Sequence, residues 1–226
     1  MSTPLPGRQK NARLALPRKS NRRSNKTRSA PTSAFLNVPY DKRFETLFLA
    51  YLAGLCGFGL VPRATLEIPG GSRRLDRIFQ LISECGYSFH DLSRVELDKK
   101  PPPTPRFNMP FELGLVVAWI KTNRRRHDWF VFESRNRRLS KSLSDLNGTD
   151  PYIHRGSPRG ILRSLTNALV RNKRQPTVTQ LEQIFRDIKK AAIVIKSELK
   201  TTTLFEARPF QELVVAAIRS ANNRIP

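Results

Sequence analysis

Apolar residues along the chain fall into short runs separated by polar turns, and the runs are of two kinds. Short apolar runs, such as 34–38 and 129–132, are typical of strands that are buried on both faces of a sheet. Longer stretches, such as 44–58, place apolar side chains three or four residues apart, which predicts helices with buried faces. The two kinds follow one another in regular alternation from residue 34 onward.

This alternation predicts the fold class. Strands are predicted at 34–38, 63–68, 87–92, 129–132 and 151–154, and helices at 44–58, 72–86, 110–120 and 157–169. A strand–helix–strand repeat implies a parallel sheet, because each helix returns the chain to the same end of the sheet and covers one of its faces. We therefore predict an α/β fold with about five parallel strands and helices on both faces. In such folds ligands bind at the carboxyl ends of the strands.

The C-terminal part of the chain has a different pattern. In the stretch 176–199 apolar residues are spaced alternately three and four apart, which predicts one helix with a continuous apolar seam. The seam consists of Val178, Leu181, Phe185, Ile188, Ala192, Ile195 and Leu199. Either this helix packs on its own domain or its seam pairs with a second copy in a homodimer. With a final helix predicted at 210–220, residues 173–226 form a helical extension of an α/β domain at 34–172.

Charge is distributed unevenly along the chain. There are 41 Lys plus Arg against 18 Asp plus Glu, which gives a formal net charge of +23. Residues 1–33 contain nine basic residues, no acidic residue and little apolar surface, so we predict a disordered basic tail. Such a tail favours nonspecific contact with nucleic acid, and its composition also resembles an organelle transit peptide. Residues 34–226 carry the remaining net charge of +14, which would attract phosphate-bearing ligands to the folded part of the chain.

Several classes of protein are excluded by composition. Two cysteines, Cys56 and Cys85, are too few for a disulfide framework, and we expect both as reduced core thiols in a cytoplasmic protein. The three histidines have no ligand spacing with cysteines or acids, which predicts no metal site. The longest apolar run, 48–61, is shorter than the roughly 20 residues of a membrane span, so no membrane partner is expected.

Two acidic residues stand where the predicted fold would hold a ligand. Asp91 lies at the end of a predicted strand, and Glu112 lies in the first turn of the following helix. A fixed carboxylate can promote cleavage of a glycosidic bond, because it stabilises the oxocarbenium character of the sugar as the base departs. A second acid can hold the ribose hydroxyls. Structural roles stay open for both residues, since Glu112 can cap its own helix and Asp91 can form an Asx-turn.

The motif Phe-Glu-Leu-Gly at 111–114 follows a strand that ends in Asp91, and the opening strand 35–40 leads into the loop 41–44. This arrangement resembles the nucleoside 2-deoxyribosyltransferase and TIR-like superfamily over most of the predicted α/β domain. Asn-Met-Pro at 108–110 stands where transferases of the group usually have Gly-Thr-Ala or a close variant. Two other stretches, around Asp91 and around Asp145, also look like a family of uncharacterised bacterial proteins.

The resemblance implies a flavodoxin-like fold and an N-glycosidase or transferase that acts on a nucleoside, nucleotide or NAD. NAD would then be a substrate, and no cofactor is implied. Glu112 matches the catalytic glutamate of the superfamily, and Asp91 matches an acid that contacts the sugar. The other expected substrate-binding residues are Tyr40, Asp41, Arg94 and Asn108. Arg94 would contact a phosphate.

A weaker phosphate site is suggested by Ser72, Arg73 and Arg74, which would open a helix whose N-terminus attracts anions. An ordinary turn with Ser72 as the helix cap explains the same residues. The arginines at 124–126 and 135–138 are interpreted as solvated loop charges, with RNA or polyphosphate binding as the alternative. Three functions therefore remain open: the enzyme, a nucleotide-binding signalling module without turnover, and a nucleic-acid-binding protein that uses its basic surface.

Overall fold

The computed structural model describes residues 33–67, 73–95, 101–123, 126–146, 148–170 and 175–225. The predicted basic tail lies outside the described residues except for Ser33, which begins the first strand. Ser72, Arg124 and Arg125 also lie outside them.

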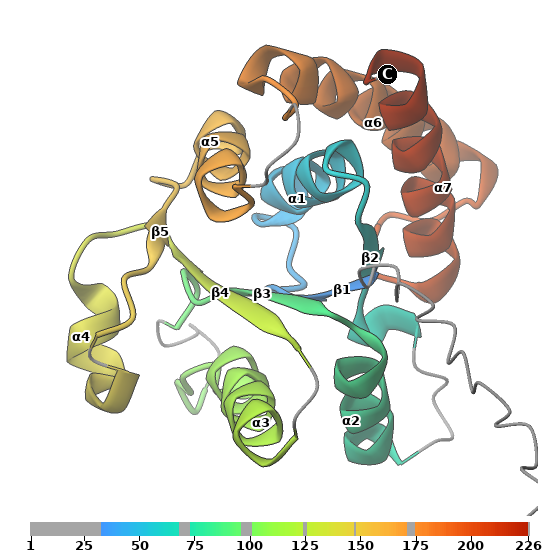
Figure 1. Ribbon diagram of the computed structural model, residues 1–226. Coiled ribbons are helices and arrows are strands. Elements are labelled where there is room, and N and C mark those ends of the chain that lie inside the picture. Colours follow the sequence, from blue (N-terminus) through green and yellow to red (C-terminus); the bar gives the residue numbers. More distant parts are fainter. Residues whose placement is uncertain are drawn as a thin grey trace, which may run out of the picture.

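A five-stranded parallel sheet forms the centre of the molecule, as the sequence predicts (Figure 1). Its strands are β1 (Ser33–Asn37), β2 (Val61–Arg63), β3 (Tyr87–Asp91), β4 (Asp128–Glu133) and β5 (Tyr152–Ile153). The spatial order is β2-β1-β3-β4-β5, with every neighbouring pair parallel. This is the flavodoxin-like order, in which the winding direction reverses between β1 and β3. Ligand sites of such sheets lie outside the carboxyl ends of the strands at this reversal.

Helices cover both faces of the sheet (Figure 1). On one face lie α1 (Glu45–Gly57) and α5 (Pro158–Ala168), and on the other lie α2 (Arg74–Glu84) and α3 (Asn108–Thr122). Two C-terminal helices, α6 (Val178–Glu198) and α7 (Ala207–Arg224), pack over the outer side of α1. A short helix, α4 (Arg138–Ser142), and a 3₁₀ turn at Ser144–Leu146 lie beside β5.

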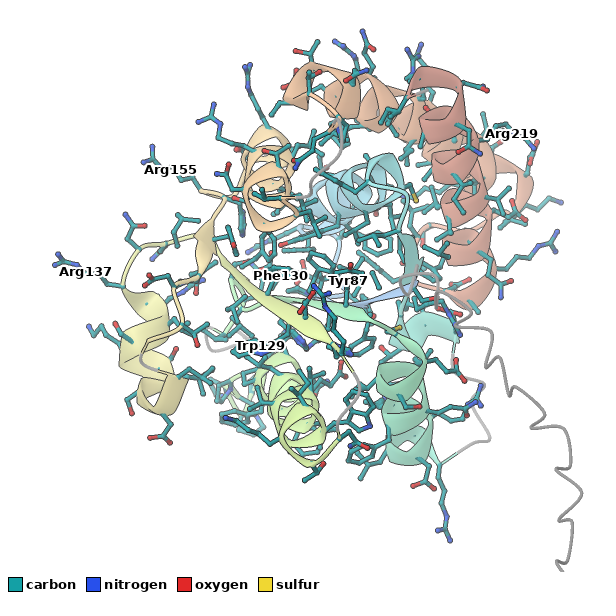
Figure 2. All side chains as sticks on the ribbon, viewed as in Figure 1. Tyr87, Trp129, Phe130, Arg137, Arg155 and Arg219 are labelled. Atoms are coloured by element: carbon teal, nitrogen blue, oxygen red, sulfur yellow. The ribbon has the colours of Figure 1, made fainter. Side chains whose placement is uncertain are left out.

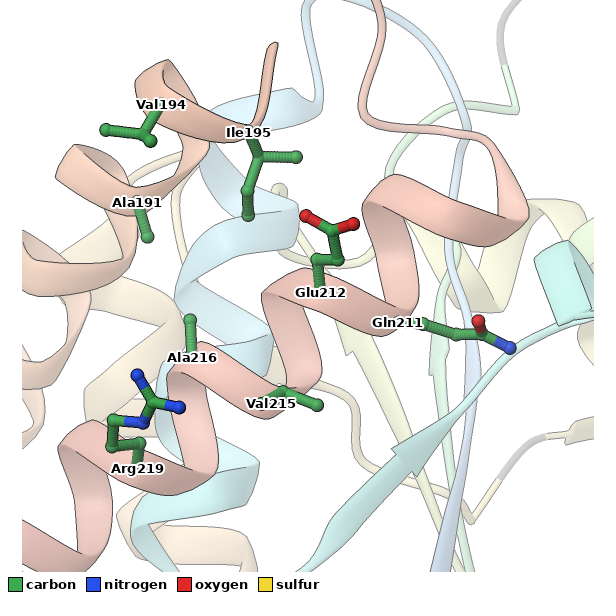
Figure 3. A pocket seen from close by; sticks show the side chains of 8 residues that line it. All are labelled: Ala191, Val194, Ile195, Gln211, Glu212, Val215, Ala216 and Arg219. Carbon is green, nitrogen blue, oxygen red and sulfur yellow. The ribbon is translucent and has the colours of Figure 1, made fainter. Parts of the chain in front are cut away.

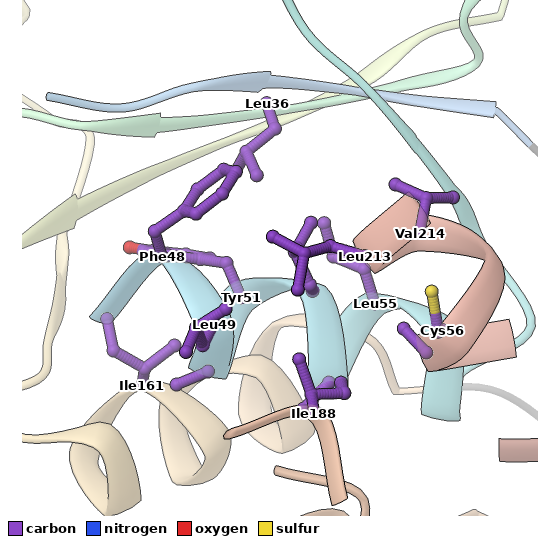
Figure 4. Close-up of a cluster of buried hydrophobic side chains, with 14 of the residues drawn as sticks. Leu36, Phe48, Leu49, Tyr51, Leu55, Cys56, Ile161, Ile188, Leu213 and Val214 are labelled. Carbon is purple, nitrogen blue, oxygen red and sulfur yellow. The ribbon is translucent and has the colours of Figure 1, made fainter. Parts of the chain in front are cut away.

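The core is centred on α1, in which every residue from Phe48 to Gly57 is buried. A helix that is apolar on all sides needs cover on all sides, and here the sheet, α5, α6 and α7 supply it (Figure 4). Glycines permit the close approach: a Cβ on Gly54 would lie 2.3 Å from the Leu165 side chain, and one on Gly57 would lie 2.3 Å from Leu181.

The apolar seam of α6 is used within the same chain. Leu181, Ile188, Ala192 and Ile195 are buried in the cluster around α1, and the other seam residues pack against that cluster. The interpretation of the seam as a homodimer surface is therefore wrong, and the alternative, packing on its own domain, is what the structure shows. The physical reason is that α1 would otherwise expose its outer apolar face.

Several boundaries differ from the prediction. The second strand is Val61–Arg63, and the stretch predicted to continue it forms a 3₁₀ turn at Thr65–Glu67. The Glu67 carboxylate closes this turn by accepting hydrogen bonds from the Ala64 amide and from Arg63 Nε, both at 2.8 Å. Helix α4 was not predicted, since its five residues carry no apolar repeat.

Among the described residues, no helix is both long and apolar enough to cross a membrane. Cys56 and Cys85 are free and buried, as expected for core thiols. Burial raises the pKa of both thiols to about 12, so they remain protonated at neutral pH.

Candidate active site

The site is built around Asn37, the last residue of β1. Its side-chain amide donates a hydrogen bond to the Met109 carbonyl at 2.9 Å and lies 2.9 Å from His90 Nδ1. These contacts tie the start of α3 to the ends of β1 and β3, where the winding of the sheet reverses. Sequence reasoning missed Asn37, although one amide in an otherwise apolar strand was a signal that could have drawn attention to it.

His90 holds Asn37 in place. An amide N–H facing Nδ1 leaves the ring proton on Nε2, which lies 3.0 Å from Ser88 Oγ. The imidazole is fully buried, and burial lowers its pKa to about 3. His90 is therefore a neutral packed residue at neutral pH.

Glu112 lies in the second turn of α3. The helix begins at Asn108, two residues earlier than predicted, so the Glu112 side chain stands beyond the capping positions. The interpretation of Glu112 as a helix cap is therefore wrong. Its side chain is 7% exposed, and within the described ranges no hydrogen bond or ion pair reaches its carboxylate.

The environment of Glu112 favours its neutral form. Burial raises the pKa of its carboxyl to about 7, while the charge of Arg74 at the start of α2 acts in the opposite direction. An ionisable group with this pKa exchanges its proton readily at neutral pH. Of the residues of the predicted phosphate site, Arg73 is the exposed N-cap of α2 and makes no side-chain capping bond, and the exposed Arg74 begins the helix. The alternative in which Ser72 is the helix cap is therefore wrong.

Tyr40 follows β1 at the carboxyl edge of the sheet. Its hydroxyl accepts a hydrogen bond from Thr65 Oγ1 at 3.1 Å. Burial raises the Tyr40 pKa, and the negative charge of Glu112 raises it further, which places the two side chains in one electrostatic environment. The loop after β1, the 3₁₀ turn and α3 thus meet at the carboxyl edge of the sheet.

The C-terminal helices reach this edge as well. The Phe205 ring, in the segment between α6 and α7, packs against Tyr40 with ring centroids 5.6 Å apart and against Phe48 at 5.2 Å. Lys196 near the end of α6 forms an ion pair with Glu45, the first residue of α1. No local pattern in the sequence pointed to these contacts, because the partners are distant in the chain.

Asp41 organises two arginines. One carboxylate oxygen accepts hydrogen bonds from the Arg43 and Phe44 amides at 3.0 and 3.1 Å, which shapes the turn before α1. The other lies 2.9 Å from Arg106 Nη1 and 3.4 Å from Arg94 Nε. Asp41 was predicted as a substrate ligand, and the structure engages both of its oxygens internally, while the side chains of Arg94 and Arg106 stay partly exposed.

Asp91 occupies a different environment. It is fully buried and accepts hydrogen bonds from the Tyr51 hydroxyl at 2.7 Å and from the Ser93 amide at 2.9 Å. The Ser93 hydroxyl also donates to it, and His154 Nε2 lies 3.3 Å away. The bond to the amide two residues on is the Asx-turn that was the alternative for this residue.

The orientation of Asp91 follows from strand geometry. Side chains alternate between faces along β3, so Asp91 points with Phe89 toward α1, while His90 points toward α3. Asp91 and Glu112 therefore lie on opposite sides of the sheet. The sequence analysis expected both in one crevice, and the structure does not bring them together.

A second polar group fixes the loop after β3. Arg138 Nη2 donates to the Ser93 carbonyl at 2.6 Å, and its Nε donates to the buried Glu133 carboxylate at 2.8 Å. The prediction that Arg138 is a solvated loop charge is therefore wrong, whereas Arg135 and Arg137 are exposed. The backbone of Ser93 is thus bonded to Asp91 through its amide and to Arg138 through its carbonyl, and these bonds fix the position of the adjacent residue, Arg94.

The other described features add no further catalytic group. Asn108, a predicted substrate ligand, is the exposed first residue of α3. A groove of about 450 Å³ lies between α6 and α7 and is lined mainly by aliphatic side chains, together with Gln211, Glu212 and Arg219 (Figure 3). Within the described ranges, no three His, Cys, Asp or Glu side chains gather closely enough to hold a metal ion.

Comparison of the chain with models of protein families, with curated proteins and with solved structures found no match.

Proposed function

We propose that this protein cleaves or transfers the N-glycosidic bond of a nucleoside, a nucleotide or NAD, with Glu112 as the catalytic carboxylate. The observation that carries the proposal is that Glu112 is buried and has no described partner, beside the reversal point of a parallel sheet. Burying a carboxyl group without partners destabilises a fold, so such a group is a candidate for chemistry.

The chemistry suits a carboxylate in a dry environment. When the bond between sugar and base breaks, its electron pair leaves with the base and the sugar acquires oxocarbenium character. An ionised Glu112 would stabilise that positive charge strongly, because Coulomb interactions are weakly screened in a buried site. Water or an acceptor nucleoside would then take the sugar. With NAD, the cationic nicotinamide ring would also favour the ionised carboxylate before the bond breaks.

Neighbouring groups have roles that fit this reaction. Tyr40 keeps its proton at neutral pH, and its hydroxyl accepts from Thr65, so its own hydrogen is free to be donated to a sugar hydroxyl. Arg94 and Arg106 use part of their donors on Asp41 and retain others for a phosphate. Asp91, with its internal partners, would act as a positioning residue for the loop that carries Arg94.

The resemblance in sequence supports the same assignment. The superfamily implies a flavodoxin-like sheet with a catalytic glutamate early in the helix that follows a central strand. The observed strand order is of that type, and Glu112 stands early in α3, directly after β3.

The test is incubation of the full chain with NAD, nucleoside monophosphates, ribonucleosides and deoxyribonucleosides, with released base measured by chromatography. We expect release from at least one substrate, and a loss of at least about a thousandfold in Glu112→Gln, a size typical of removing a key electrostatic group. Glu84→Gln, which removes a partly exposed glutamate from α2, is the matched control and should retain full activity. Absence of base release from every substrate would refute the proposal.

A nucleotide-binding module without turnover is the second candidate. The observation in its favour is the Arg94–Asp41–Arg106 cluster, which can hold a phosphate without any contribution from Glu112. Nucleotides would then raise the melting temperature of the wild type and of Glu112→Gln equally, with no product formed. Loss of the shift in Arg106→Gln would assign the binding to this cluster.

A further inference from the structure

A basic surface lies on the side of the molecule formed by β5 and α5. Residues 151–181 contain no Asp or Glu and six Lys or Arg, so this stretch is basic throughout. Helix α5 lies within it, and both of its charged residues, Arg159 and Arg163, are arginines. The chemistry proposed for Glu112 makes no use of this stretch.

Two further arginines lie on the adjacent loops that follow β4 and β5. Arg137 follows β4 with φ 60°, and Arg155 follows β5 with φ 53°. The loops are neighbours because Glu133 pairs with Ile153 in the sheet. Both side chains are exposed and point away from the body on one side of the molecule (Figure 2).

Helix α5 extends this surface. Its apolar residues Ile161, Leu162 and Leu165 are buried toward α1, which leaves Arg159 and Arg163 exposed one turn apart. From α6, Arg186 borders the same groove as Arg159. The acidic residue in this groove is Glu182, which lies 3.4 Å from Arg159.

The chemistry of this surface indicates the partner. Arginine binds phosphate through two parallel N–H donors and stays charged at any physiological pH. A helix that binds a membrane surface exposes large apolar side chains beside its charges, whereas the exposed residues of α5 are Arg159, Arg163 and Asn167. The arginines of α5 suit a polymer of phosphates, and the groove between Arg159 and Arg186 also contains the apolar side chains of Pro158, Leu162 and Phe185.

We propose that Arg137, Arg155, Arg159, Arg163 and Arg186 form a surface that binds the phosphate backbone of a nucleic acid. Contacts to phosphates carry no sequence information directly, so binding would depend on charge and geometry and not on base identity. The surface is separate from Glu112, and its function does not depend on the proposed reaction.

The experiment measures binding of the full chain to a labelled mixed-sequence DNA duplex and to a labelled RNA strand over a series of salt concentrations. The patch variant combines Arg155→Asn, Arg159→Gln and Arg163→Gln, with Asn chosen because it tolerates a positive φ. We expect affinity to fall on the order of tenfold at physiological salt. The slope of log affinity against log salt for the duplex should decrease by about 2.7, from about 0.9 per lost phosphate contact.

The control variant removes the same charge elsewhere by combining Lys121→Gln, Arg208→Gln and Arg219→Gln, all exposed residues of α3 and α7. Its affinity should stay within about threefold of the wild type, because the three substituted residues lie outside the proposed surface. The basic residues 1–33 are the same in all three proteins and contribute equally to binding. Equal losses in the two variants would overturn the proposal, as would absence of binding by the wild type at low salt. Tighter binding to phosphatidylserine vesicles that depends on the patch residues would overturn it in favour of a membrane. Glu112→Gln should bind as the wild type does.

Discussion

Two buried carboxylates stand near the carboxyl edge of the same sheet, and their surroundings differ. Asp91 faces α1 and is fully buried, and Tyr51 and Ser93 donate hydrogen bonds to its two oxygens. Glu112 faces the α3 side, is almost as buried, and has no hydrogen-bond partner among the described residues. A satisfied carboxylate stabilises its neighbourhood, whereas an unsatisfied one raises the free energy of the fold and is available for a ligand.

The largest expected effect on stability comes from removing the satisfied carboxylate. Asp91→Ala leaves the Tyr51 hydroxyl and the Ser93 amide buried without their acceptor, so the free energy of unfolding should fall by about 3–5 kcal/mol. Urea unfolding followed by circular dichroism gives the change. A loss below about 1 kcal/mol would show that the Asp91 cluster does not stabilise the fold.

The unsatisfied carboxylate should behave in the opposite way. The Glu112 pKa is raised from 4.5 to about 7, so between these values the folded protein holds a proton that the unfolded chain releases. Wild-type stability therefore decreases as pH rises through this window. Glu112→Gln does not titrate, so at pH 8 it should be more stable than the wild type by up to about 3 kcal/mol.

Unfolding of the two proteins at pH 4 and at pH 8 checks this prediction. The difference should vanish at pH 4, where the carboxyl is protonated in both the folded and the unfolded state. Destabilisation at pH 8 would mean that Glu112 has a stabilising partner and would contradict the comparison.

The same pKa predicts how activity depends on pH. If the ionised carboxylate is the active form, kcat/KM should fall about tenfold per pH unit as pH decreases below about 7, the pKa of Glu112. Initial rates of base release between pH 5 and pH 8.5 provide the profile. A rate that increases toward pH 5 would instead assign Glu112 as a proton donor to the leaving base.

The smallest expected change in stability comes from removing a single hydroxyl group of the Asp91 cluster. Tyr51→Phe removes the hydroxyl that donates to Asp91 and keeps the ring stacked on Phe44 and edge-to-face with Phe132, so stability should fall by about 1 kcal/mol. Denaturant unfolding measures it. Activity should remain within about twofold, since Asp91 keeps its Ser93 contacts, and a large loss of activity would place Tyr51 closer to the chemistry.

Much of the fold could be predicted because the signals were local. The helix at α5 begins with Ser157 as its cap, which accepts a hydrogen bond from the Gly160 amide at 3.1 Å, and Pro158 follows at the first helical position. The stretch of α6 was predicted from its apolar spacing alone. Helix α4 was missed because its five residues carry no apolar repeat, and the 3₁₀ turn after β2 was missed because a contact of the Glu67 side chain with the backbone closes it.

The candidate site was predicted only in part. Glu112 and Tyr40 were identified from the order of strands and helices and from the resemblance, and the charge of Glu112 contributes to the raised Tyr40 pKa. Asn37, Arg106 and Phe205 were missed, since each reaches the site through a contact with a residue distant in sequence. The expected pairing of Asp91 with Glu112 failed because a strand end offers two faces and the sequence did not say which one α3 covers.

The sequence by itself determined the parallel α/β architecture, the position of Glu112 in the helix after β3, and the basic stretch around α5. These follow from short-range patterns: apolar spacing, capping residues and runs of like charge. Tertiary structure alone decided that α6 and α7 cover α1, that Asp91 is satisfied internally, and that Glu112 is buried without a described partner. The physical reason is that burial and pairing depend on which distant segments pack together, and the same side chain is stabilising or reactive according to that packing.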